Sequence, residues 1–237
     1  KRIAAADLAD RAERLAAALA ALGLEPGDRV GVFAPNTQEH LEAYYAVPCS
    51  GLVLHTMNPR LSPEQIAFTV EHAGDRAIVV DASLAAALAP IAARLRGVEH
   101  YVVIGEDPER SIPGAHDYEA LIAAESGAFD WPELDERSAA ALCYTSGTTG
   151  NPKGVVLGYD NLIAAGDAGA EMEALTSKEE VLAYLPMAWI GQNIFSYTQW
   201  MVCGFTVNCP ESAITVSADM REIGPTYYFA PPRVLEA

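Results

Sequence analysis

The chain is poor in basic residues and contains no basic cluster. Its 237 residues include 15 lysines and arginines against 32 aspartates and glutamates, which gives a formal net charge of −17. Proteins that bind nucleic acid gather lysine and arginine against the phosphates, and membrane-surface segments use polybasic patches. We therefore expect no nucleic acid partner. Any anionic ligand must be held by local donors against an unfavourable overall charge.

Long apolar runs are also missing. A membrane-spanning helix needs about 20 consecutive apolar residues. The longest candidate, residues 194–207, is interrupted by Gln199 and Gly204, and the first residues have the pattern of a polar helix rather than of a signal peptide. We expect no transmembrane segment, and peripheral contact with a membrane stays an open alternative.

Neither cysteine nor histidine occurs in a metal-binding pattern. The chain has no Cys-x-x-Cys pair, and its five histidines are scattered, so we expect no metal ligand among them. The Gly-x-Ser-x-Gly turn of many hydrolases is absent as well. The cysteines lie in apolar segments, which predicts buried free thiols and a reducing, cytoplasmic location. They are Cys49, Cys143, Cys203 and Cys209.

One segment is rich in groups that bind phosphate. Residues 144–156 have the sequence Tyr-Thr-Ser-Gly-Thr-Thr-Gly-Asn-Pro-Lys-Gly-Val-Val. Glycine can adopt positive φ and lets successive N–H groups converge on an anion. The hydroxyls add neutral donors, and the lysine adds a compact positive charge. We therefore predict a polyphosphate-binding loop formed by Thr145, Ser146, Gly147, Thr148, Thr149, Gly150 and Lys153.

Other interpretations of this loop fit less well. A Walker A loop places Gly-Lys-Ser/Thr after its spacer, whereas here Gly150 lies three positions before Lys153 and Gly154 follows it. The Rossmann Gly-x-Gly-x-x-Gly pattern is absent from the segment. An ordinary surface loop of turn residues is the structural alternative. The apolar strand-like residues 139–143 before the loop and the β-branched pair after it favour a phosphate loop.

Apolar strand-like segments alternate with helical ones through most of the chain, which predicts an α/β protein with a mostly parallel sheet. We expect strands at residues 29–34, 52–56, 77–80, 101–104, 139–143, 155–157, 181–185, 205–208 and 227–230. Helices are expected at residues 7–22, 39–49, 62–73, 82–95, 160–175, 194–203 and 218–223. The proline- and acid-rich residues 106–137 predict a connector between sub-lobes 1–105 and 138–237.

The motif Tyr-Thr-Ser-Gly-Thr-Thr-Gly-x-Pro-Lys-Gly resembles the signature phosphate loop of the adenylate-forming superfamily. The resemblance covers nearly the whole chain, since three further segments occur in the order seen in fatty acyl-CoA ligases: residues 28–32, 58–66 and 184–189. Residues 224–233 are most similar to bacterial long-chain fatty acyl-CoA synthetases, whereas residues 58–82 are similar to broader medium-chain ligases. The resemblance implies layered, mostly parallel sheets with flanking helices, residues 1–237 being the N-terminal part of the AMP-binding domain.

The resemblance also implies a reaction. In the family a fatty acid attacks the α-phosphate of ATP, accompanied by Mg²⁺, to give acyl-AMP and pyrophosphate, and CoA then displaces AMP. Thr145 and Lys153 are the implied catalytic residues of this ligase, and Trp189 and Gln192 are implied to contact the acyl substrate. Trp189 as an ordinary core tryptophan stays an alternative. No protein metal ligand is assigned.

Two departures from the family pattern leave alternatives open. Gly158 and Tyr159 stand where relatives usually have Ser-His or Thr-His. The segments that hold adenine, ribose and Mg²⁺ in relatives have no match, and adenylate-forming enzymes are typically more than twice as long. We therefore expect an N-terminal portion that is inactive alone. The alternatives are a non-catalytic nucleotide-binding fragment and an adenylate-forming ligase with a different acceptor.

Overall fold

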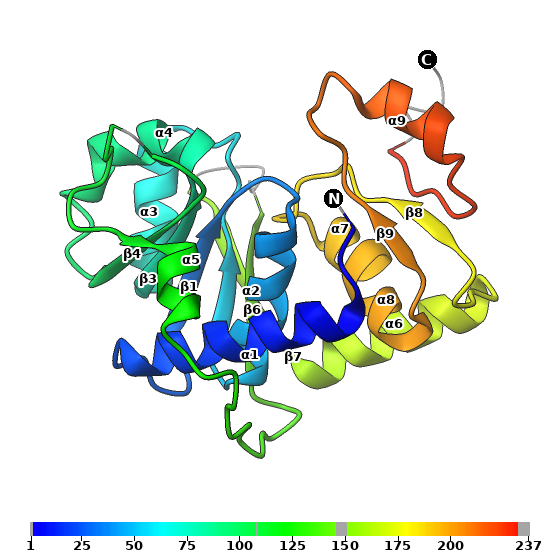
Figure 1. Cartoon of the computed structure of the whole chain (residues 1–237), viewed down its shortest axis with the longest axis horizontal. Coiled ribbons are helices and arrows are strands. Elements are labelled where there is room, and N and C mark those ends of the chain that lie inside the picture. The colour runs from blue at the N-terminus through cyan, green and yellow to red at the C-terminus, as the bar shows by residue number, and fades with distance from the viewer. Residues whose placement is uncertain (1, 108, 146–150, 232–237) are drawn as a thin grey trace. The chain divides into compact units, whose positions relative to one another are not determined.

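The structure is a computed structural model that describes residues 2–107, 109–145 and 151–231 (Figure 1). Its contacts divide the chain into two compact units, residues 1–159 and residues 160–237. Among the described residues, every helix is too short or too polar to cross a lipid bilayer.

The first unit is built on a seven-stranded sheet with the order β5-β4-β3-β1-β2-β6-β7. All neighbouring strands are parallel except β6 and β7, which form an antiparallel hairpin. This confirms the predicted α/β class with a mostly parallel sheet. The strands are β1 Arg29–Phe33, β2 Val53–Thr56, β3 Asp75–Asp81, β4 His100–Ile104, β5 His116–Asp117, β6 Ala139–Thr145 and β7 Lys153–Gly158.

Within the described residues of the first unit, five helices flank this sheet, and four of them match the predicted ranges within a few residues. Ser62 and Gln65 form a capping box at the start of one helix, where Pro63 takes the first helical position. The helices are α1 Ala5–Ala21, α2 Gln38–Cys49, α3 Pro63–Ala73, α4 Ala82–Ala92 and α5 Tyr118–Ala123.

The predicted connector contains regular structure that the sequence did not reveal. Strand β5 and helix α5 lie within residues 106–137, and Asp117 caps α5 by accepting a hydrogen bond from the Ala120 N–H. Buried side chains hold the segment on the first unit, because Tyr118 and Ile122 of α5 are almost fully covered. The proposed sub-lobes 1–105 and 138–237 stay a prediction.

Two helix layers cover the sheet. Helices α3 and α4 share one apolar cluster with alternate strand residues, among them Phe33, Ile78 and Val103. On the other side α1 packs against α2 and α5 (Figure 1), burying Leu15 and Leu19 completely. The predicted burial of all four cysteines is wrong in part: Cys143 is buried, Cys203 is half-buried, and Cys49 and Cys209, which lie at element ends, are exposed.

The second unit combines a short parallel pair of strands with several helices. They are α6 Tyr159–Met172, β8 Glu180–Leu182, α7 Ile190–Asn193, a π-helical turn Ile194–Thr198, α8 Gln199–Cys203, β9 Thr206–Asn208 and α9 Val216–Ile223. The helix predicted at 194–203 is therefore not uniform. The Thr198 hydroxyl donates to Oδ1 of Asn193, five residues earlier, a spacing that matches the π turn.

The strand predicted at residues 227–230 does not form. Tyr227 makes a single isolated bridge to Val181, and no strand follows it within the described residues. Pro225 and Pro231 flank the segment, and proline lacks the N–H that a strand ladder needs.

Candidate nucleotide-binding site

The hairpin of β6 and β7 carries the predicted phosphate loop. Thr145 is the last residue of β6, Lys153 is the first residue of β7, and the two are direct register partners. Both are exposed. The strand pair thus brings two of the predicted phosphate-binding residues to the same end of the hairpin. The other five, Ser146, Gly147, Thr148, Thr149 and Gly150, lie outside the described residues.

Gly154, which directly follows Lys153, determines the packing next to this pair. Tyr144 is the register partner of Gly154. A Cβ atom at Gly154 would lie 3.2 Å from Cζ of Tyr144 and 3.1 Å from Cδ1 of Leu142. Because glycine has no side chain, the tyrosine ring can lie close to the β7 backbone.

Tyr144 also contacts two histidines that the phosphate-loop motif does not include. The Tyr144 hydroxyl lies 2.8 Å from Nδ1 of His72, and its ring centroid lies 5.0 Å from that of His55. Burial, with a smaller contribution from the charge of Asp75, raises the pKa of Tyr144 to about 12. The phenol therefore keeps its proton at neutral pH. The relevant signal in the sequence is a histidine inside the buried strand β2.

A groove of about 610 Å³ opens beside the hairpin within the first unit. Arg29, His72, Tyr144, Gly154 and Val156 contribute to its walls. Val156 is 62% exposed, so part of the groove is apolar surface open to solvent. A second cavity, of about 690 Å³, lies near the ends of β4 and β5 and includes none of the predicted site residues.

The predicted acyl-site residues belong to the second unit. Trp189 takes the N-cap position of α7 and is half-buried. Gln192 is 2% exposed, and its Oε1 accepts a hydrogen bond of 3.0 Å from the Leu185 N–H. Phe195 stacks on Phe229 with ring centroids 4.0 Å apart. Gln192, Phe195 and Phe229 line one small cavity, which gives this unit an amide and two aromatic rings in close proximity.

The described residues contain no group of three or more histidine, cysteine, aspartate or glutamate side chains arranged to hold a metal ion. The described part of the hairpin offers a hydroxyl at Thr145 and an ammonium group at Lys153. Both groups can donate hydrogen bonds to phosphate oxygens, and the ammonium group adds a positive charge.

Sequence comparison identifies the class of protein that carries this hairpin. The family model for the AMP-binding enzyme matches residues 1–237, so the chain belongs to the AMP-binding enzyme family.

Among curated relatives, the 3-methylmercaptopropionyl-CoA ligase of Ruegeria lacuscaerulensis is 40% identical over 186 residues, covering 76% of this chain and 34% of the relative. The medium-chain-fatty-acid–CoA ligase of Ectopseudomonas oleovorans is 38% identical over 75% of this chain and 33% of the relative. The long-chain-fatty-acid–CoA ligase of Thermus thermophilus is 39% identical over 83% of this chain and 36% of the relative. The chain thus spans about a third of the length of these relatives.

Solved structures agree on the fold. The anthranilate CoA ligase AuaEII in complex with anthranoyl-AMP superposes with a TM-score of 0.87 at 21% identity, over 94% of this chain and 44% of that chain. A putative long-chain-fatty-acid CoA ligase from Rhodopseudomonas palustris superposes with a TM-score of 0.85 at 25% identity, over 98% of this chain and 57% of that chain. The layered, mostly parallel architecture predicted from the sequence is therefore that of adenylate-forming CoA ligases.

Proposed function

We propose that this chain supplies the phosphate-binding hairpin and part of the acyl pocket of an ATP-dependent acid–CoA ligase that acts on a fatty acid. The observation that carries the proposal is the pairing of Thr145 with Lys153 at the mouth of a loop with the family's signature sequence. The CoA ligases among the relatives support the same reaction class.

The reaction has two steps. A carboxylate oxygen of the acid attacks the α-phosphorus of ATP, and the bond to the bridging oxygen breaks so that pyrophosphate leaves with the electron pair. The thiolate of CoA then attacks the acyl carbon, and AMP leaves. Catalysis of the first step depends mainly on positioning and on stabilising charge on the leaving phosphates.

Thr145 and Lys153 are the proposed catalytic residues of this step. The Lys153 ammonium group would neutralise charge that builds up on the β- and γ-phosphates, and the Thr145 hydroxyl would donate to a phosphate oxygen. The glycines and hydroxyls at 146–150 would complete the cradle. Mg²⁺ would accompany ATP, and no residue of the chain is proposed as its ligand.

Trp189 and Gln192 are the proposed residues of the acyl site. An amide donor beside the stacked rings of Phe195 and Phe229 suits an acid with a polar head and an apolar chain. The relatives accept different acids, including a methylmercapto acid and medium- and long-chain fatty acids. Within that range we propose a long-chain acid, because residues 224–233 resemble bacterial long-chain synthetases. Because the reaction consumes ATP and CoA, we propose a cytoplasmic location.

Exchange of labelled pyrophosphate into ATP tests the proposal. It is measured with a panel that contains 3-methylmercaptopropionate and medium- and long-chain fatty acids, on this chain and on the longest natural reading frame that contains it. Exchange that depends on one of these acids, followed by thioester formation with CoA, supports the ligase. ATP binding without exchange for any acid supports the non-catalytic nucleotide-binding alternative. Exchange without thioester formation identifies an adenylate-forming ligase with another acceptor.

A further inference from the structure

A buried polar pair crosses the centre of the sheet in the first unit. Nδ1 of His55 on β2 lies 2.7 Å from Oδ2 of Asp75 on β3, and each residue is only 1% exposed. Strand β1 lies between these two strands. Its residue in register with His55 is Gly31. A Cβ atom at Gly31 would lie 3.0 Å from Asp75 Oδ2, so the missing side chain makes room for the pair.

Stability alone does not account for this pair. A buried ion pair or polar pair loses its hydration, and apolar residues of similar volume often stabilise a core as well or better. Burial raises the pKa of the Asp75 carboxyl, which the adjacent His55 opposes. The second carboxyl oxygen, Oδ1, has no hydrogen-bond partner among the described residues. A buried carboxyl with a perturbed pKa and one specific partner is a candidate for a functional role.

The pair continues to the phosphate-loop hairpin. The ring of His55 packs on the ring of Tyr144, with centroids 5.0 Å apart and planes inclined at 52°. On its other side, the Tyr144 hydroxyl bonds to Nδ1 of His72 in the last turn of α3. Asp75, His55, Tyr144 and His72 thus form a continuous row, the polar row, from β3 across the sheet to β6 and α3.

The polar row ends where the phosphate loop begins. Tyr144 directly precedes Thr145, and its register partner Gly154 directly follows Lys153. A ring fixed by two imidazoles fixes the backbone of β6 at that point, and the glycine opposite lets β7 approach it. The Tyr144 ring therefore lies next to the register pair of Thr145 and Lys153.

We propose that the polar row is a positioning device that holds the stem of the phosphate loop for ATP, with His55 and Asp75 as positioning residues and Tyr144 as the link. The inference rests on the proposed function. None of these side chains needs to touch the nucleotide, because they act through the hairpin backbone.

The test compares two buried histidines. His55→Phe keeps a ring but loses the bond to Asp75, whereas His55→Gln can still donate to the carboxylate. His40→Gln is the matched control, because His40 is equally buried at 1% exposure and lies on α2 outside the row. Asp75→Asn and Tyr144→Phe probe the two ends conservatively, so the proposal stays testable if His55→Phe does not fold. Thermal unfolding of each variant identifies the temperature at which all are folded.

Pyrophosphate exchange in the natural reading frame gives the kinetic result. We expect His55→Phe to raise the KM for ATP and to lower kcat, each by about 10- to 100-fold. A small misplacement of a reacting group has effects of this size. The KM for the acid should not change in His55→Phe. The variant His55→Gln should retain most of the wild-type activity. If His55→Phe and Tyr144→Phe lose thermal stability as His40→Gln does but leave both parameters within about twofold, the row is only structural and the proposal is wrong.

Imidazole nitrogen NMR of the wild-type chain provides a second readout that needs no turnover. Adding ATP with Mg²⁺, compared with Mg²⁺ alone, should shift the signals of His55 and His72 but not that of His40. Unchanged row signals in a sample that binds ATP would overturn the inference and leave the ligase intact. Absence of exchange with every acid, together with shifted row signals, would overturn the ligase assignment and leave the positioning of a nucleotide by the row intact.

Discussion

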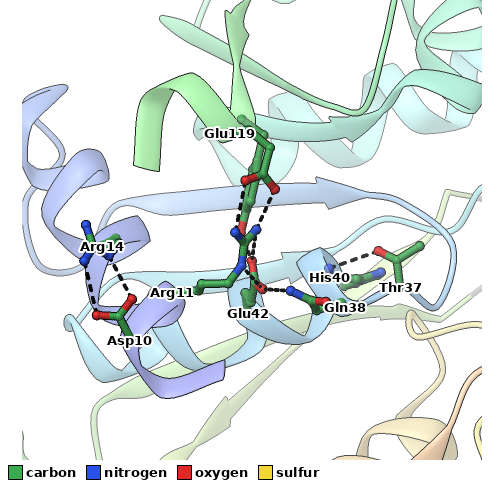
Figure 2. Close-up of polar contacts among 9 residues, drawn as sticks. Asp10, Arg11, Arg14, Thr37, Gln38, His40, Glu42 and Glu119 are labelled. Carbon is green, nitrogen blue, oxygen red and sulfur yellow. Dashed lines mark hydrogen bonds and ion pairs between the residues drawn. The ribbon is translucent and has the colours of Figure 1, made fainter. Parts of the chain in front are cut away.

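Nε of Arg11 in α1 lies 2.6 Å from Oε1 of Glu42 in α2, whose side chain is fully buried (Figure 2). The same carboxylate accepts hydrogen bonds of 2.6 Å from Gln38 Nε2 and from the Tyr118 hydroxyl. On its outer side the guanidinium group of Arg11 binds Glu119 of α5. One buried carboxylate therefore joins three helices on one face of the sheet.

Replacing Arg11 with alanine should destabilise this unit strongly. The change leaves the Glu42 carboxylate buried without its positive partner, and breaking a buried pair in this way typically lowers the free energy of unfolding by about 3–5 kcal/mol. Urea-induced unfolding followed by circular dichroism measures the loss. Asp10→Ala is the control, because it breaks the exposed Asp10–Arg14 pair on the same helix and should change the midpoint far less. Equal midpoints for the two variants would contradict the assigned role of Glu42.

Stability should fall in mildly acidic solution because of His40. Burial lowers the pKa of His40 to about 4 from an ordinary value of 6.5, although its bond to the Pro35 carbonyl opposes the shift. Between these values the unfolded chain binds a proton that the folded chain does not. The free energy of unfolding that comes from keeping His40 neutral is therefore fully present above pH 6.5. It is lost progressively as the pH falls to about 4, by up to about 3 kcal/mol.

The difference in urea midpoint between wild type and His40→Gln isolates the effect of His40, since other groups titrate in the same range. Urea midpoints measured from pH 7.5 to pH 4.5 should converge as the pH falls. A constant offset between wild type and His40→Gln across this range would show that this imidazole is not buried as described.

Lys153→Ala should reduce pyrophosphate exchange by about 100-fold, because removing one group that stabilises charge in the transition state typically has an effect of this size. Lys153→Arg keeps the charge with a different shape and should be intermediate. Lys178→Ala is the matched control, because that lysine is also exposed and lies in the second unit. Steady-state exchange at varied ATP and acid concentrations measures the effect. An equal loss for Lys178→Ala would mean that general charge, not the hairpin, explains the result.

Local chemistry explains why much of the fold was predictable. Ser62 and Pro63 mark the start of α3, and buried apolar runs mark β1 to β4, all within a few residues. The failures depend on long-range packing. Strand β5 and helix α5 lie in an acidic, proline-containing segment in which apolar residues such as Tyr118 become buried only on the finished sheet.

Prediction of the candidate site from the sequence is limited in the same way, by contacts between distant residues. The motif predicts Thr145 and Lys153 because the phosphate binding proposed for them depends on residues close together in the sequence. The contact between His55 and Asp75 depends instead on β1 lying between β2 and β3, and a strand order of this kind is not contained in local periodicity. The contribution of Gly31 follows only from that order, since nothing around residue 31 in the sequence distinguishes it from any other strand glycine.

Gly31→Ala tests this packing without any assumption about activity. The new Cβ would lie 2.9 Å from Sδ of Met57 and 3.0 Å from Oδ2 of Asp75, closer than normal contacts allow. Methionine can move, but the carboxylate is held by His55, so we expect overpacking to lower the free energy of unfolding by about 1–3 kcal/mol. Gly97→Ala is the control, because its nearest atom would lie 3.8 Å away, an ordinary contact. If the cause is displacement of Asp75, the nitrogen NMR signal of His55 should shift in Gly31→Ala and not in Gly97→Ala. Destabilisation with an unchanged His55 signal would assign the clash to Met57 instead.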